Sequence, residues 1–197
     1  MAKAHIFINM DIEADGPCPG LNSMLALGAE ARDQDMNVLG HFYTTIETLP
    51  GAKPDPETTA WWLNQKREIY EAARKDPSDP HVAMGAFRGW INGMAGRAIP
   101  VACMAPTGFD WPFIYYYLEA FGANNPFNFR TLDGKTMMAI ALRGKYDYIH
   151  GRDLPDQWFD NGLPHTHHAL DDAKQQGAVF AKVWVDLQAR FKEGGAK

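Results

Sequence analysis

The sequence has little cysteine and no long apolar run. Only two of its 197 residues are cysteines, Cys18 and Cys103, and their spacing matches no metal-binding motif. No stretch approaches the roughly eighteen apolar residues of a transmembrane helix. The N-terminus shows neither the apolar core nor the cleavage site of a secretory signal. We therefore expect a cytoplasmic protein with reduced thiols that does not enter a membrane.

The sequence also has no excess of basic charge. Its 19 Lys and Arg are outnumbered by 24 Asp and Glu, which gives a formal net charge of −5. This balance argues against a protein that binds long duplex DNA, because such proteins present a basic face. An enzyme acting on nucleic-acid ends stays compatible with it, since bound metal ions supply positive charge and their acidic ligands lower the net value.

The length and composition predict one globular domain over residues 1–197. Apolar residues make up 46% of the chain and aromatic residues 12%, which is typical of a packed core. We find no internal repeat and no low-complexity linker. Strands followed by alternating helices and strands favour an α/β domain with a mixed sheet. We expect strands over residues 5–13, 24–32, 37–46, 99–104 and 129–132, an irregular segment over 146–164, and helices from about residue 56 and over 81–93, 111–121, 134–143 and 169–191.

Two carboxylates close the first expected strand. Side chains alternate faces along a strand, so Asp11 and Glu13 lie side by side on one face. Their like charges repel unless a cation neutralises them. Hard oxygen ligands suit Mg²⁺ or Mn²⁺ better than zinc. An ordinary acidic turn is the alternative, and the pair alone does not exclude it. The alternation puts Phe7, Asn9, Asp11 and Glu13 on one face and Ile6, Ile8, Met10 and Ile12 on the other.

Two further positions are candidates to complete a metal site. Asp110 follows the expected fourth strand at a helix start, where an aspartate often serves only as a cap. The carboxyl ends of sheet strands are, however, where α/β folds place their sites. His167 lies five residues before Asp172, across the start of the last helix. A solvated histidine-rich loop is the alternative there.

These pieces occur in a recognisable order. Met10-Asp-Ile-Glu13, Gly108-Phe-Asp110 and His167-His-Ala-Leu-Asp-Asp-Ala173 resemble the three exonuclease motifs of the DEDDh family of 3′→5′ exonucleases. The third motif is the most specific, and the motif order covers nearly the whole chain. The resemblance implies a ribonuclease-H-like α/β fold, in which helices flank a central mixed five-stranded sheet.

The resemblance also implies roles for the residues. Asp11, Glu13, Asp110 and Asp172 are expected to bind two divalent metal ions, Mg²⁺ or Mn²⁺, and His167 is expected to be the general base. Two metal ions clamp the attacking and leaving oxygens of an in-line displacement. A histidine with a pKa near about 6.5 can accept a proton from water at neutral pH.

The neighbouring residues fit the pattern less well. His168 has the wrong spacing for the base, and Asp171 is expected on the helix surface. Pro106 departs from the family, many members of which carry a small or polar residue at that position. The departure bears on the backbone near Asp110 and removes no ligand.

An aromatic and basic patch is a candidate substrate-binding surface. Trp61, Trp62, Lys66 and Arg67 fall on one expected helix. Bases stack on exposed aromatic rings, and basic side chains track phosphates. We expect at least one tryptophan of such a pair in the core, and because adjacent helical residues point about 100° apart, the other can face the cleft.

The leading hypothesis is a stand-alone 3′→5′ exoribonuclease, similar to an oligoribonuclease. It would act on 3′ ends of single-stranded RNA or short oligoribonucleotides and release nucleoside 5′-monophosphates. A single-stranded DNA exonuclease of the proofreading type is the close alternative, because no residue reveals a 2′-hydroxyl contact. Two other classes are a non-catalytic nucleic-acid-binding module and a zinc phosphomonoesterase in which His165, His167 and Asp172 hold the metal. Relatives suggest a homodimer, although nothing in the sequence marks an interface.

Overall fold

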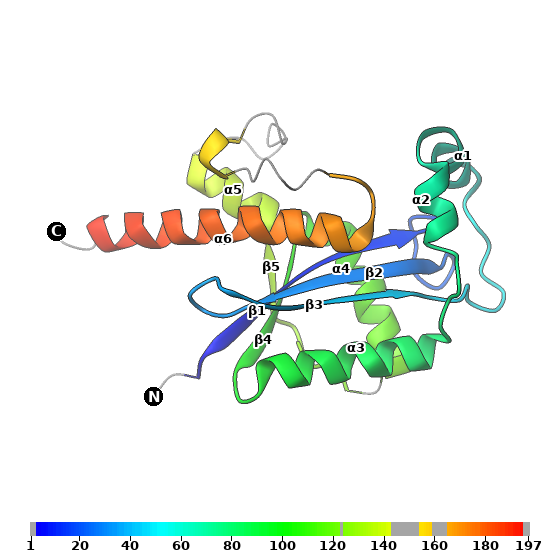
Figure 1. The fold of residues 1–197 in the computed structure, drawn as a ribbon, viewed down its shortest axis with the longest axis horizontal. Helices are drawn as coiled ribbons and strands as arrows, with labels where there is room; N and C mark the ends of the chain where they lie inside the picture. The colour runs from blue at the N-terminus through cyan, green and yellow to red at the C-terminus, as the bar shows by residue number, and fades with distance from the viewer. Residues whose placement is uncertain (1–2, 123, 143–153, 159–164, 195–197) are drawn as a thin grey trace.

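A five-stranded mixed sheet forms the centre of the protein, in the strand order β3-β2-β1-β4-β5 (Figure 1). The computed structural model describes residues 3–122, 124–142, 154–158 and 165–194. The first three strands form an antiparallel meander, and the last two run parallel to β1. The predicted mixed five-stranded sheet is thus confirmed, and β1 is its central strand. The strands are β1 His5–Ala14, β2 Met24–Arg32, β3 Val38–Thr45, β4 Ile99–Met104 and β5 Thr131–Asp133.

Helices cover both faces of this sheet. Figure 1 shows α3 along one face, α6 along the other, and α1 with α2 beside the end of the sheet where β1 stops. None of the described helices combines the length and apolar character needed to cross a bilayer. The helices are α1 Pro56–Gln65, α2 Arg67–Ala72, α3 Pro80–Ala95, α4 Thr107–Tyr117, α5 Gly134–Leu142 and α6 Ala169–Gly194, with a π-helical turn Leu118–Gly122 and a 3₁₀ turn Asp156–Trp158.

One helix boundary agrees with the prediction from the sequence, and two differ from it. The helix from Pro56 begins as predicted, because the Asp55 carboxylate accepts a hydrogen bond from the Thr58 N–H at 2.8 Å. It is not continuous, since Lys66 leaves helical geometry and separates α1 from α2. α4 begins at Thr107, four residues before the predicted start. Most of the segment expected to be irregular, 146–164, lies outside the described residues.

The two faces of β1 differ in character. Ile6, Ile8, Met10 and Ile12 are buried in the core that α3 completes. On the other face, Phe7 packs against Phe180 and Trp184 of α6, with ring centroids 5.5 and 4.9 Å apart. Further along that face, the side chains become polar and acidic: Asn9, Asp11 and Glu13. The predicted alternation is therefore confirmed.

Two glycines let α6 approach the sheet closely. A Cβ at Gly28 on β2 would lie 2.3 Å from the backbone of Ala169, the first residue of α6. A Cβ at Gly177 would lie 2.3 Å from the Glu30 carboxylate on β2. Since Gly28 pairs with Asp11 across the strands, this close packing sets the first turn of α6 beside the acidic end of β1.

Candidate metal centre and catalytic site

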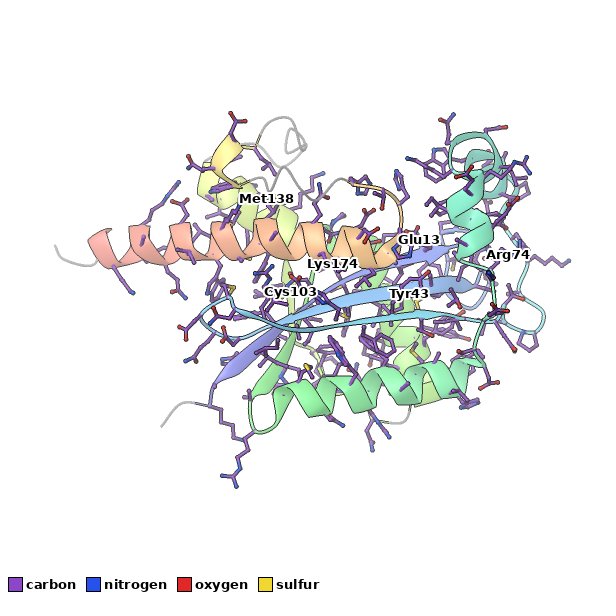
Figure 2. All side chains as sticks on the ribbon, viewed as in Figure 1. Glu13, Tyr43, Arg74, Cys103, Met138 and Lys174 are labelled. Atoms are coloured by element: carbon purple, nitrogen blue, oxygen red, sulfur yellow. The ribbon has the colours of Figure 1, made fainter. Side chains whose placement is uncertain are left out.

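The acidic end of β1 forms the floor of the site. Glu13 is 6% exposed, and its Oε1 atom is buried without a hydrogen-bond partner. Figure 2 shows Glu13 at the end of the sheet nearest the first turn of α6. Asp11 is partly buried, and its Oδ1 accepts a hydrogen bond from the Gln176 side chain at 2.7 Å. A buried carboxylate oxygen without a donor is what an absent cation would leave.

Asp110 approaches the same point from α4. It is 6% exposed and accepts a hydrogen bond from the Ile12 N–H, between the two acidic residues of β1, at 3.1 Å. Asp110 therefore does not cap α4, whose N-cap is Pro106. The helix starts early because the Thr107 N–H and hydroxyl both donate to the Asp133 carboxylate at the end of β5, at 2.7 and 3.1 Å. This early start turns Asp110 toward β1.

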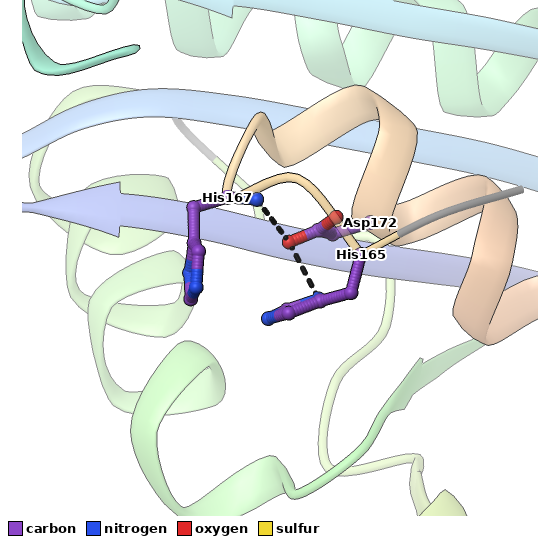
Figure 3. A group of neighbouring side chains, drawn as sticks. All are labelled: His165, His167 and Asp172. Carbon is purple, nitrogen blue, oxygen red and sulfur yellow. Dashed lines mark hydrogen bonds and ion pairs between the residues drawn. The ribbon is translucent and has the colours of Figure 1, made fainter. Parts of the chain in front are cut away.

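Asp172 completes the group from the first turn of α6. The backbone N–H groups of Thr166 and His167 donate to its two oxygens at 2.8 and 3.0 Å. His165 Nδ1 lies 2.8 Å from Oδ2 (Figure 3). The loop before α6 thus wraps around this carboxylate, and one oxygen each of Asp11, Glu13 and Asp172 lies within 4.8 Å of the others.

The electrostatics show how crowded these acids are. Burial, followed by the charges of Asp110, Glu13 and Asp172, raises the pKa of Asp11 well above its ordinary value. Burial and the charges of Asp172 and Asp110 likewise raise the pKa of Glu13. Burial raises the pKa of Asp110 to about 7. Such shifts indicate an environment that favours protons or cations over free carboxylates.

Asp172 differs because it has donors of its own. Burial opposes its ionisation, but the hydrogen bonds from His165 and from the Thr166 N–H outweigh burial and lower the pKa of Asp172. Asp172 is therefore favoured as an anion, whereas burial, with repulsion at Asp11 and Glu13, disfavours the ionised forms of the other three acids. The donor set fits divalent cations that prefer carboxylate oxygens.

The candidate base, His167, lies at the mouth of the site. Its φ of +62° is in the left-handed region, which a non-glycine residue adopts at some energetic cost. Its ring packs edge-on to Trp61 at 5.1 Å and lies 4.3 Å from the ring of His165. Burial, followed by the neighbouring His165, lowers the pKa of His167. A neutral imidazole, able to accept a proton, is thus favoured at neutral pH.

The two neighbours that did not fit the motif lie elsewhere. His168 stacks on Tyr43 of β3, with ring centroids 4.6 Å apart. The side chain of Asp171 is half exposed, at 49%, on the surface of α6. Both placements agree with the expectation from spacing.

Two residues in contact with the acids were missed from the sequence as parts of the carboxylate site. Gln176 bridges the site, because its amide donates to Asp11 while its oxygen accepts from the Ala105 N–H at 3.1 Å. Its spacing was a usable signal, since residue 176 is one helical turn after Asp172 and shares its face. His165 contacts Asp172 through the conformation of the loop, which no local pattern announces.

The four candidate substrate-binding residues lie in different environments: one is buried, two lie near the histidines, and one is in an exposed ion pair. Trp62 is 4% exposed and donates its indole N–H to the Ala14 carbonyl at 3.1 Å, whereas Trp61 is 41% exposed beside His167. One tryptophan is thus buried and one faces the site, as expected. The charge of Lys66 reaches both histidines: it opposes the rise in the pKa of His165 that the hydrogen bond to Asp172 causes, and it adds to the fall in the pKa of His167 that burial causes. Arg67 instead forms an exposed ion pair with Glu71 at 3.8 Å.

A second donor group overlaps the carboxylates. One ligand atom each of His165, His167 and Asp172 lies within 4.8 Å of the others. Figure 3 shows the Asp172 carboxylate, from the first turn of α6, between His167 and His165. Asp172 therefore belongs to both groups.

Known proteins share this fold. A relative, the 3′-5′ DNA exonuclease Cap18 of Escherichia coli, is 29% identical over 183 residues, which cover 89% of each chain. The zinc-bound form of the E. coli exonuclease I complex with single-stranded DNA matches with a TM-score of 0.62 at 18% identity, covering 98% of this chain and 42% of that one. The exonuclease I complex with a dT13 oligonucleotide gives a TM-score of 0.64 at 18% identity, covering 98% and 43%. These likenesses confirm the predicted fold, and the chain spans less than half the length of exonuclease I.

A family match covers most of the chain. Residues 6–184 match the sequence model described as the 3′-5′ exoribonuclease Rv2179c-like domain. The match includes every residue of the acidic group, the loop that carries the histidines, and most of α6. The chain therefore belongs to the 3′-5′ exoribonuclease Rv2179c-like domain family and is a 3′-5′ exonuclease.

Proposed function

We propose that this protein, as a single domain over residues 1–197, removes nucleotides from the 3′ end of single-stranded RNA or short oligoribonucleotides. Asp11, Glu13, Asp110 and Asp172 would bind two divalent ions, Mg²⁺ or Mn²⁺. The observation that carries the proposal is the convergence of these four carboxylates, from β1, α4 and α6, beside His167. The orphaned oxygen of Glu13 supports a cation at this point.

The chain's own residues divide the chemistry between them. When bound, the metal ions supply positive charge that activates water and stabilises the leaving oxygen. His167 accepts the proton of the attacking water, which its neutral state allows. Gln176 fixes the orientation of Asp11 by donating to one of its oxygens. Asp172 holds the loop that carries His167, so the acid and the base are positioned together.

Trp61 is suited to hold the terminal base. Its ring is exposed beside His167 and is supported edge-on by Trp62 at 4.9 Å. An aromatic face accepts any base, and stacking contributes about 1–3 kcal/mol per base. Lys66 lies close enough to influence both histidines and would attract the phosphates. Arg67 would add a second positive charge on leaving its exposed ion pair with Glu71.

RNA is the leading substrate because the family is described as exoribonuclease. DNA is the second candidate, since Cap18 is described as a DNA exonuclease. A homodimer is also proposed, and size-exclusion chromatography with light scattering tests it against the chain mass of 22.0 kDa.

Parallel degradation of 5′-labelled RNA and DNA of one sequence tests the proposal. Attack from the 3′ end shortens the 5′-labelled strand stepwise and gives a ladder of labelled fragments. Attack from the 5′ end releases a labelled mononucleotide at once. Faster shortening of RNA supports the leading substrate, and faster shortening of DNA replaces it with the alternative. Activity that persists in EDTA would contradict the metal site. Hydrolysis of p-nitrophenyl phosphate without any shortening would favour the zinc phosphomonoesterase instead.

A further inference from the structure

The two donor groups of the site differ in chemical type. Asp11, Glu13 and Asp172 offer only carboxylate oxygens, which suit Mg²⁺ and Mn²⁺. His165, His167 and Asp172 offer two imidazoles and one carboxylate, which suit zinc and similar borderline cations. Because both groups use Asp172, an ion in one group changes the ligands left for the other.

The histidine group is well formed for a small cation. His165 Nδ1 lies 2.8 Å from Asp172 Oδ2, in a hydrogen bond whose proton would be released to solvent if Nδ1 bound zinc, and the two imidazole rings are 4.3 Å apart. Two backbone N–H groups hold Asp172 in place, so the carboxylate is fixed before any ion binds. The side chain of His165 is 52% exposed, which gives an ion access from solvent. Three protein ligands with an open fourth position is a common zinc arrangement.

We propose that His165, His167 and Asp172 form a binding site for zinc that inhibits the exonuclease. The site shares Asp172 with the carboxylate group and adds His165, which takes no step in the proposed hydrolysis. Imidazole ligands favour zinc, nickel and copper over magnesium, so the site selects against the activating ion.

Inhibition follows from what zinc would occupy, and this step rests on the proposed function. A lone pair of His167 that binds zinc cannot accept a proton from water. Asp172 bound to the same ion contributes less negative charge to the carboxylate group. Zinc therefore removes the base and weakens a shared ligand, even when Mg²⁺ is abundant.

Binding is measured directly on the metal-free protein with Co²⁺, which absorbs visible light when histidine and carboxylate ligands surround it tetrahedrally. Zinc added afterwards displaces Co²⁺ and removes the absorption, which gives the relative zinc affinity. His165→Gln is the main variant, because glutamine can still donate a hydrogen bond to Asp172 but is a poor zinc ligand. His168→Gln is the matched control, since His168 stacks on Tyr43 outside the group.

The expected result is an absorption band in the wild-type protein and in His168→Gln. In His165→Gln the zinc affinity falls by at least about tenfold, because even outer contacts of metal ligands contribute about 10-fold to 100-fold. A wild-type band that is unchanged in His165→Gln would overturn the proposal, and so would the absence of any Co²⁺ band in the wild-type protein.

A second measurement keeps this proposal separate from the proposed function. Exonuclease activity in Mg²⁺ is titrated with zinc, and each variant is compared with its own zinc-free rate. Half-inhibition should need about tenfold more zinc in His165→Gln than in the wild type or His168→Gln. Equal zinc sensitivity in all three proteins contradicts inhibition through His165. If the wild type lacks activity in Mg²⁺, the proposed function fails, while the Co²⁺ band still decides the zinc site.

Discussion

The two faces of β1 carry opposite chemistry on one backbone. Toward α3, the strand presents Ile8 and Met10, both with no exposed surface, to an apolar core. Toward α6, it presents Asp11 and Glu13, whose pKa values are raised by burial and by the charges of the carboxylates around them. The first face supplies free energy of folding through burial of apolar surface. The second face lowers the stability of the metal-free protein, because buried like charges repel.

The apolar face of β1 holds the acids of the other face together. Carboxylates this close would separate in a flexible loop, but β1 is anchored on its other face and paired on both edges. Cations that bind the acidic face would then recover the free energy that repulsion costs. Variants on the two faces should therefore have different consequences, one set for activity and the other for stability.

Asp11→Asn should have the largest effect on activity. We expect the rate to fall by about 10⁴-fold, since metal-assisted charge stabilisation contributes several kcal/mol. The variant should stay folded, because the substitution removes one member of a repelling group. A single-turnover assay on labelled RNA measures the rate, and Asp171→Asn on the surface of α6 is the control. Similar rates in both variants would contradict the assignment.

His167→Ala should reduce turnover by about 10³-fold, which is typical of the loss of a general base. Metal and RNA binding should persist, because the four carboxylates remain. Turnover is compared with the dissociation constant for RNA measured in Ca²⁺ or at low temperature. His168→Ala is the neighbouring control and should retain activity. A loss of RNA binding that accounts for the whole effect would assign His167 to substrate binding.

Met10→Ala tests the apolar face of the same strand. The free energy of unfolding should fall by about 3 kcal/mol, because a fully buried side chain leaves a cavity. The rate of the fraction that stays folded should change little. Chemical denaturation followed by circular dichroism gives the stability. A large loss of activity without a loss of stability would contradict the division between the faces.

The pH dependence of stability gives the smallest expected effect. Asp110, with a pKa of about 7, binds a proton in the folded state at pH values where the unfolded state has lost it. Asp11 and Glu13 act in the same direction, as does His165, whose pKa the hydrogen bond to Asp172 raises. Stability in EDTA should therefore fall as pH rises from about 5 to about 8. The lowered pKa of His167 opposes this trend.

Thermal unfolding in EDTA measures the trend. We expect the unfolding temperature to be lower at pH 8 than at pH 5.5 by about 2–4 °C, which corresponds to about 1 kcal/mol in a chain of this size. Added Mg²⁺ should reduce the difference, and Asp110→Asn should reduce it in EDTA. Stability that rises with pH in EDTA would contradict the raised pKa values.

Period-two alternation and motif order predicted the sheet, the face of β1 and the convergence of the acids. The alternation is a local pattern, and strand geometry alone puts Ile8 and Asp11 on opposite faces of β1. The convergence of the acids, from distant parts of the sequence, was instead implied by the resemblance to the DEDDh family. The early start of α4 could not be predicted, because its stabilising partner, Asp133, lies 26 residues away on β5. The break at Lys66 was missed for a similar reason, since a favourable helical sequence continues through it.

The loop before α6 contains the part of the site that the sequence could not predict. The spacing of His167 and Asp172 was readable, but the contact between His165 and Asp172 depends on a left-handed residue at position 167. Non-glycine residues adopt that conformation only where their surroundings hold it. Here the Asp172 carboxylate accepts the His167 N–H and supplies that constraint.

The most direct test of the difference between the faces is the number of Mn²⁺ ions bound per chain, measured by electron paramagnetic resonance. The wild type and Met10→Ala should each bind two ions per folded chain. Asp11→Asn should bind fewer while its circular dichroism spectrum stays that of the folded protein. An Asp11→Asn protein that binds Mn²⁺ as the wild type does would contradict the account.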